Sequence, residues 1–269
     1  MPVKKEPSGR RSVQAEVEVS GTPEEVWQAI ASGPGISSWF VPTKMDERVG
    51  GTATSSFGPG NSMDSVAKIT VWEPPQRFVA ETREGPGTVA TEWTVEAKAG
   101  GTCTVRVVHS WFASTDDWDD QFAGHSYGWI SFFQILRLYL AHFRGQPCSP
   151  IQLMAASTEV KEKAWDSLIQ PLGLTNASVG ARVTAPADAP ALSGVVEVVN
   201  PPEWPGLLLR LDKPVPAIAH FFALPMGGQV MLPVRLYLYG HSAGDVAKDV
   251  ETTWQGWLNR RFPPLPAGH

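Results

Sequence analysis

The chain has 269 residues, of which 42% are hydrophobic and 18% are charged, and it contains 11 Trp. This composition excludes a disordered protein, and the length exceeds that of one typical domain, so we expect two globular domains. The net charge of -5 argues against nucleic acid or an anionic membrane as a partner.

The two cysteines, Cys103 and Cys148, lie in no metal-ligand pattern, and we expect neither a metal nor another cofactor. The aspartates within 116–120 are expected to favour the start of a helix rather than to bind a cation. Such sparse use of cysteine predicts a location in the reducing cytoplasm. Residues 1–11 carry a basic cluster that no apolar run follows, so they are predicted to be a flexible tail rather than a signal peptide.

The first predicted elements are a strand and a short helix. Residues 13–19 alternate apolar and polar side chains, as a half-buried strand does. Thr22 is predicted to cap a helix, with Pro23 in the first turn and Glu25 completing a capping box. A second helical turn is expected at 36–40. Antiparallel strands follow, separated by turns rich in Gly and Pro, at 52–57, 65–72, 77–82, 89–97 and 102–112.

A long helix is predicted at 121–144. Its apolar residues recur every three or four positions and form a broad face, made of Phe122, Trp129, Phe133, Leu136, Leu140 and Phe143. The apolar run is about 15 residues long, whereas a membrane span needs about 20, so we expect this helix to lie on a sheet. The predicted fold class is therefore α+β, an antiparallel sheet with a long helix laid across it.

The second half of the chain repeats this plan. The sequence VWEPP at 71–75 returns as VVNPP at 198–202, and the glycine pair at 100–101 returns at 227–228, in both cases 127 residues later. One constant offset for two separate turns indicates an internal repeat. We therefore expect a first domain at 12–145 and, after a short linker, a shortened copy of the same fold at 150–263.

Several stretches of the first domain resemble one family. They are the opening VSGTPEEVWQAI, the Trp39-Phe40 pair, the VGG turn at 49–51, VWEPPQRFV at 71–79 and the WTVE strand from Trp93. These resemble the SRPBCC (START-like) helix-grip superfamily and, within it, the Hsp90-ATPase-activator-homologue-like group of bacterial proteins. The resemblance covers 12–144 well and 150–262 weakly. It implies a curved sheet gripping the long helix, with an apolar cavity that holds a hydrophobic small molecule in many members, and no shared catalytic motif.

Alternation along two strands predicts which side chains face that cavity. The odd-numbered residues of 89–97 and 102–112 share the inner face. On the long helix, His125 projects on the same side as Phe132, Leu136 and Phe143, so it is expected to converge with His109 on one pocket. The predicted ligand-binding residues are Trp39, Phe40, Phe57, Thr91, Trp93, His109, Trp111, His125, Trp129 and Phe133.

Two interpretations of His109 and His125 stay open. As core residues they would be hydrogen-bonded to a hydroxyl or carbonyl group, as buried polar groups normally are. As functional residues they would contact a ligand or transfer a proton. The aromatic residues likewise either pack an ordinary core or line a ligand cavity. No catalytic residue is predicted beyond these two candidates.

The second copy lacks the polar groups of the first. At the constant offset, Leu236 replaces His109, and the whole inner face of that strand becomes aliphatic. We therefore expect ligand binding in the first domain. A second, apolar pocket in the shortened copy is the alternative, with His220 at the position of Trp93 as its polar feature.

Three functions fit this sequence, which contains no nucleophile elbow, phosphate loop or dinucleotide fingerprint. The first is binding of a hydrophobic, polycyclic small molecule, with sequestration of a natural product as one form. The second is a metal-free enzyme resembling polyketide cyclases and aromatases, in which His109 or His125 assists cyclisation or dehydration. The third is a co-chaperone-like module that binds a protein partner. The oligomeric state is not predicted.

Overall fold

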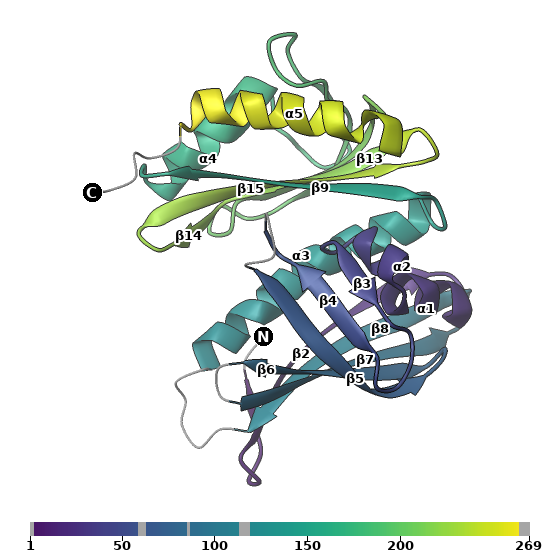
Figure 1. The fold of residues 1–269 in the computed structure, drawn as a ribbon. Helices are drawn as coiled ribbons and strands as arrows, with labels where there is room; N and C mark the ends of the chain where they lie inside the picture. The colour runs from purple at the N-terminus through teal and green to yellow at the C-terminus, as the bar shows by residue number, and fades with distance from the viewer. Residues whose placement is uncertain (1–2, 59–62, 85–86, 113–118, 264–269) are drawn as a thin grey trace. The chain divides into compact units, whose positions relative to one another are not determined.

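The computed structural model describes residues 3–58, 63–84, 87–112 and 119–263, and the side chains of Glu84 and of residues 119–127 fall outside this description. The chain forms two compact units, 1–145 and 146–269. Each unit contains one antiparallel sheet and one long helix (Figure 1), so the predicted α+β helix-grip class is confirmed.

Unit 1 is built on a sheet in which all neighbouring strands are antiparallel. All the predicted strands are present, and the sheet gains one short strand at each edge that the sequence analysis did not predict. In sheet order the strands are β1 (Lys4–Lys5), β2 (Arg10–Ser20), β8 (Thr102–Phe112), β7 (Gly87–Lys98), β6 (Arg77–Glu84), β5 (Asp64–Glu73), β4 (Thr52–Ser56) and β3 (Thr43–Met45).

The start of the chain differs from the predicted tail at 1–11. Lys4–Lys5 form β1, which pairs with the beginning of β2. The chain reverses between the two strands, and the Glu6 carbonyl accepts from the Gly9 amide at 3.0 Å. Since β2 offers unpaired backbone groups at the edge of the sheet, even this basic segment finds partners there, and lysine-rich edge strands are a common way to end a sheet.

The predicted helix start at Thr22 is confirmed. In α1 (Pro23–Ala31), the Thr22 hydroxyl accepts from the Glu25 amide at 3.3 Å, and the Glu25 carboxylate accepts from the Thr22 amide at 2.9 Å. Both halves of the capping box are therefore formed. The inner side of this short helix is buried, with Trp27 only 5% exposed.

The second helix, α2 (Gly33–Ser37), begins earlier than predicted. Ser32 caps it by accepting from the Gly35 amide at 3.0 Å. No side chain fits at Gly35, because a Cβ there would lie 1.9 Å from the carbonyl oxygen of Gln28. This close approach holds α2 against the end of α1, and the chain leaves α2 toward Phe40.

The long helix α3 (Asp119–His142) agrees with the predicted helix to within two residues at each end. It lies across the sheet of unit 1 and contacts β2. Arg137 is exposed on its outer side. The buried residues among its described side chains are Phe132, Phe133, Ile135, Leu136, Tyr139 and Leu140. Phe122, also predicted to belong to this face, has a side chain outside the described residues.

Unit 2 repeats the strand order of unit 1. The order β9-β15-β13-β12-β11-β10 parallels β2-β8-β7-β6-β5-β4, and β14 pairs with β15 beyond the end of β13. The strands are β9 (Cys148–Ser157), β10 (Arg182–Thr184), β11 (Ser193–Val199), β12 (Gly206–Lys213), β13 (Ala217–Phe222), β14 (Leu224–Met226) and β15 (Gln229–Tyr239). The helices are α4 (Lys161–Ile169), a 3-10 turn (Gln170–Leu172) and α5 (Ala243–Arg261), which contacts β9 and β15.

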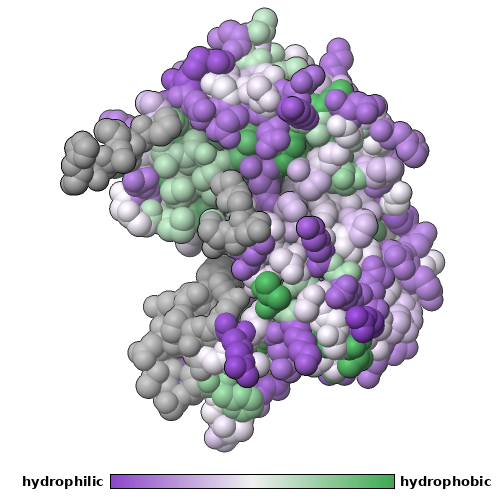
Figure 2. All heavy atoms as spheres, viewed as in Figure 1, coloured by the Kyte–Doolittle hydropathy of each residue, from purple (hydrophilic) through white to green (hydrophobic). Residues whose placement is uncertain are grey.

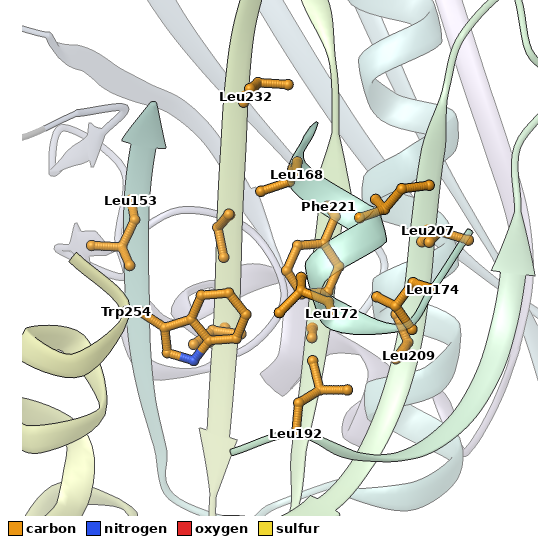
Figure 3. Close-up of a cluster of buried hydrophobic side chains, with 14 of the residues drawn as sticks. Leu153, Leu168, Leu172, Leu174, Leu192, Leu207, Leu209, Phe221, Leu232 and Trp254 are labelled. Atoms are coloured by element: carbon orange, nitrogen blue, oxygen red, sulfur yellow. The ribbon is translucent and has the colours of Figure 1, made fainter. Parts of the chain in front are cut away.

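The core of unit 2 lies between its sheet and its helices. The predicted aliphatic inner face of β15 is confirmed, because Val230, Leu232, Val234, Leu236 and Leu238 are all buried in one cluster. Trp254 of α5 and Leu168 of α4 join this cluster (Figure 3). It contains no charged side chain.

The two copies do not keep one offset throughout. Across the β5–β6 turn, Trp72 pairs with Phe78 and five residues lie between them. Across the β11–β12 turn, Val199 pairs with Leu207 and seven residues lie between them. The second turn is therefore two residues longer, and positions beyond it shift.

Strand pairing corrects the prediction for His220 by one residue. Trp93 pairs with Val107 in unit 1, and the residue that pairs with Val234, at the offset of 127 from Val107, is Phe221. Phe221, not His220, therefore occupies the position of Trp93, and Phe221 points into the core. His220 points to the other face of the sheet, since neighbours along a strand alternate.

Hydrophilic residues predominate on the face of the molecule seen in Figure 2, and strongly hydrophobic residues appear there as separate spots. Single exposed apolar residues are normal on protein surfaces. Among the described residues, no helix is both long enough and apolar enough to span a membrane.

Candidate functional site

A cavity of about 560 Å³ lies in unit 1 beside the N-terminal half of α3. Its walls come from β5 to β8, from Phe57 and Met63 in the connection between β4 and β5, from Phe40 after α2, and from α3. Its walls are mainly apolar, with a few hydroxyl groups and one carboxylate. The lining residues are Phe40, Phe57, Met63, Asp64, Ser65, Thr82, Val89, Thr91, His109, Gly128, Trp129 and Phe132.

His109 is held by two hydrogen bonds from neighbouring elements. Its Nδ1 lies 2.9 Å from the Thr91 hydroxyl, on the adjacent strand β7. Its Nε2 accepts from the indole N–H of Trp129, on α3, at 2.5 Å. Thus one imidazole ring joins β7, β8 and the helix at the cavity wall.

These contacts define the protonation state of His109. Because an indole N–H is only a donor, Nε2 must be an unprotonated acceptor. A neutral imidazole then carries its proton on Nδ1, which donates to Thr91. Protonation at Nε2 would break the bond to Trp129. The pairing with a hydroxyl agrees with the interpretation of His109 as a satisfied polar residue of the core.

Aromatic rings form the deeper wall of the cavity. Phe40 stacks on Trp129 with ring centroids 5.0 Å apart, and it meets Phe132 edge-on at 4.4 Å. Trp129 in turn meets Trp93 at 5.0 Å in a perpendicular arrangement. Such contacts favour one orientation of each ring, so the rings of Phe40, Trp129 and Phe132 form a packed aromatic part of the cavity wall.

The predicted ligand-binding residues divide into groups by position. Those that line the cavity are Phe40, Phe57, Thr91, His109 and Trp129. Three more lie buried behind this wall and do not line it: Trp39, Trp93 and Phe133.

Two further predicted residues, Trp111 and His125, do not belong to either group. Trp111 is not among the residues that line the cavity; it packs with Val13 and with Val89, which does line it. It stands near the end of β8, where Arg11 of β2 is its pairing partner. The His125 side chain lies outside the described residues, and so do the aspartates within 116–120.

Several lining residues were missed by the sequence analysis. Ser65 and Thr82 occupy inward positions of predicted strands, so alternation could have identified both. Gly128 is harder to foresee, because its contribution is a missing side chain on a helix. A Cβ at Gly128 would meet no described atom within 4 Å. The glycine therefore leaves room in the cavity.

His220 does not create a pocket in unit 2. It is 4% exposed, and its Nδ1 has no hydrogen-bond partner among the described atoms. Burial, together with the positive charge of Arg235, lowers the pKa of His220 to about 3. The ring is therefore neutral near pH 7. Within the described ranges, no cluster of three or more His, Cys, Asp or Glu side chains could hold a metal ion.

Comparison with known proteins gives one family match, and it lies in the first unit. Residues 20–141 match the family described as Activator of Hsp90 ATPase homolog 1-like protein. No curated protein matches the chain.

Three solved structures illustrate the similarity. CalU16 from Micromonospora echinospora is 20% identical, with a TM-score of 0.41, over 52% of this chain and 83% of that chain. The Aha1 dimer from Colwellia psychrerythraea is 20% identical, with a TM-score of 0.41, over 50% and 98%. BexL, a di-domain ARO/CYC from the BE-7585A biosynthetic pathway, is 12% identical, with a TM-score of 0.44, over 95% and 100%.

Proposed function

We propose that unit 1, of which residues 20–141 match the model of the Activator of Hsp90 ATPase homolog 1-like family, binds a hydrophobic, polycyclic small molecule in the cavity beside α3. The observation that carries this proposal is the cavity itself, about 560 Å³ in volume and walled by aromatic rings. Pockets for small molecules typically measure about 300–1,000 Å³ and are mostly apolar. Flat aromatic walls favour a ligand with fused planar rings, because stacked and edge-on contacts are then available over its whole surface.

Few polar groups are available to orient the ligand. The hydroxyl groups of Ser65 and Thr82 and the carboxylate of Asp64 belong to the lining. Thr91 already pairs with His109. A ligand that is mainly apolar, with one or two hydrogen-bonding substituents, matches this balance.

The pairing of His109 favours binding over catalysis. A general base must be within reach of the proton it removes and have a free lone pair. The only lone pair of neutral His109 is engaged by the N–H of Trp129. We therefore assign His109 to holding Trp129 in the cavity wall.

Sequestration of a natural product is one biological form of such binding. Neither Cys103 nor Cys148 forms a disulfide, which supports the cytoplasm as the location.

Mass spectrometry tests the proposal. Native spectra of the purified full-length protein, before and after incubation with polycyclic aromatic and polyketide compounds, should contain a stoichiometric adduct that disappears on denaturation. Denaturing spectra recorded alongside identify the released compound.

A matched pair of variants at Gly128 locates the adduct. Gly128→Trp should fill the cavity and lower ligand affinity more than tenfold, whereas Gly128→Ala adds one methyl group and should leave affinity nearly unchanged. Both variants should keep or raise helix stability, because glycine costs a helix interior about 1 kcal/mol relative to alanine. Equal affinities for the two variants would place binding elsewhere.

The alternatives have their own outcomes. Conversion of the bound compound by the wild-type protein, lost in His109→Ala with binding retained, would establish the cyclase-like enzyme instead. Absence of any adduct, combined with stimulation of a purified Hsp90 ATPase, would favour the co-chaperone-like module.

A further inference from the structure

An aromatic cluster fills the space between α1 and the β5–β6 hairpin in unit 1. The ring of Trp27 lies 5.2 Å from that of Trp72 and 5.8 Å from that of Phe78. Trp72 and Phe78 also contact each other, at 5.7 Å. The rings of Trp72 and Phe78 pack against Trp27, which is only 5% exposed. They close the gap between helix and hairpin.

Unit 2 has the same arrangement without two of the rings. Trp165 of α4 stands where Trp27 stands in α1. The β11–β12 pair that corresponds to Trp72 and Phe78 is Val199 and Leu207, according to strand pairing. Two aromatic side chains are therefore replaced by two smaller aliphatic ones, around a tryptophan that is retained.

A pocket of about 280 Å³ occupies this place in unit 2. Trp165, Val199 and Leu207 all belong to its lining. Further apolar wall is supplied by Ile169 and Leu174, and Asn200 contributes an amide. The residues that distinguish the two copies are thus the residues that open the pocket.

Charged groups at the pocket select the ligand further. Glu162 and Asp166 contribute two carboxylates to the lining, and Lys161 contributes one ammonium group. The Lys161 ammonium is already engaged, since it donates to the Glu203 carbonyl at 2.9 Å. The balance of charge therefore disfavours an anionic ligand.

We propose that unit 2 binds a small planar aromatic molecule, neutral or cationic and about the size of indole, against the ring of Trp165. The ligand occupies the space that Trp72 and Phe78 fill in unit 1, and it repeats their contacts with a tryptophan. Ring contacts of this kind are favourable at centroid distances of about 4.5–7 Å. This site is independent of the cavity beside α3.

Titration of the full-length protein with indole tests the site. With Trp side chains labelled by ¹⁵N, the Nε1–H signal of Trp165, identified through its loss in Trp165→Phe, should shift and saturate. Tryptamine should bind more tightly than indole-3-acetate. A saturable shift confined to other tryptophan signals would overturn the proposal, and tighter binding of indole-3-acetate would overturn its charge preference.

Refilling the pocket is the sharper test. The double variant Val199→Trp/Leu207→Phe restores the side chains of unit 1 and should weaken indole binding more than tenfold, while Val199→Ala should still bind. If the double variant does not fold, Trp165→Leu takes its place, because it removes the ring and keeps the wall apolar. Unchanged indole affinity in the folded double variant, or in Trp165→Leu, would refute the site.

Discussion

The hydrogen bond between Trp129 and His109 should be measurable as an energetic coupling. Trp129→Phe removes the N–H and leaves Nε2 of His109 without its donor, and His109→Leu leaves the indole N–H without its acceptor. An unsatisfied buried group costs about 1–3 kcal/mol, whereas removal of both partners can be nearly neutral. Both side chains are half-buried at the cavity wall, so we expect each single variant to fall in the lower part of that range. The double variant should therefore lose less stability than the sum of the single variants, by about 1–2 kcal/mol.

Amide hydrogen exchange of β8 in the full-length protein is the suitable assay, because it reports on unit 1 alone although the chain has two units. The bond from His109 to Thr91 is absent in both His109→Leu and the double variant, so it cancels from the cycle. Thr82→Val, on the same cavity wall, serves as control and should change stability by less than about 0.5 kcal/mol. A coupling below about 0.3 kcal/mol would refute the pairing and reopen a proton-transfer role for His109.

Three further predictions concern other parts of the chain. Thr22→Ala should lower stability by about 1 kcal/mol through loss of the capping box, as measured by the exchange of α1 amides; Thr22→Ser should retain it. Leu232→Ala, in the aliphatic core of unit 2, should cost about 2–5 kcal/mol in denaturant unfolding, and a loss below 1 kcal/mol would contradict close packing there. Unfolded His220 takes up a proton near pH 6.5 and folded His220 only near pH 3, so the unfolded state binds more protons between these values. Stability should therefore fall as the pH falls below 6.5, by up to about 1.4 kcal/mol per unit, and His220→Leu should remove this slope, as pH-dependent thermal unfolding would reveal.

Local sequence signals were sufficient for most of the fold. The capping box at Thr22 depends on residues three positions apart, and the strands of unit 1 depend on alternation within each strand. The inward positions of Thr91 and His109 followed from the same rule. These features could be predicted because each is decided by neighbours along the chain.

Two kinds of feature could not be predicted in this way: how deeply an inward side chain is buried, and the length of the turns. Trp93 and Thr91 both point inward, yet Thr91 reaches the cavity and Trp93 lies behind Trp129. Alternation predicts the face of the sheet on which a side chain lies, but it does not predict which aromatic ring separates another ring from the cavity. The position of His220 was wrong because the offset is not constant: it is 129 from Phe78 to Leu207, 128 from Trp93 to Phe221 and 127 from Val107 to Val234, since the turns of the two copies differ in length.

The unequal hairpins of the two copies have a consequence for protein engineering. The β5–β6 and β11–β12 hairpins differ by an even number of residues between their paired positions. An even change leaves the same side chains facing inward on both flanking strands. The segment from Trp72 to Phe78 could therefore replace the segment from Val199 to Leu207 without changing which side chains of either strand face inward. The reverse exchange would place the hairpin that leaves a pocket beside Trp165 next to Trp27 in unit 1.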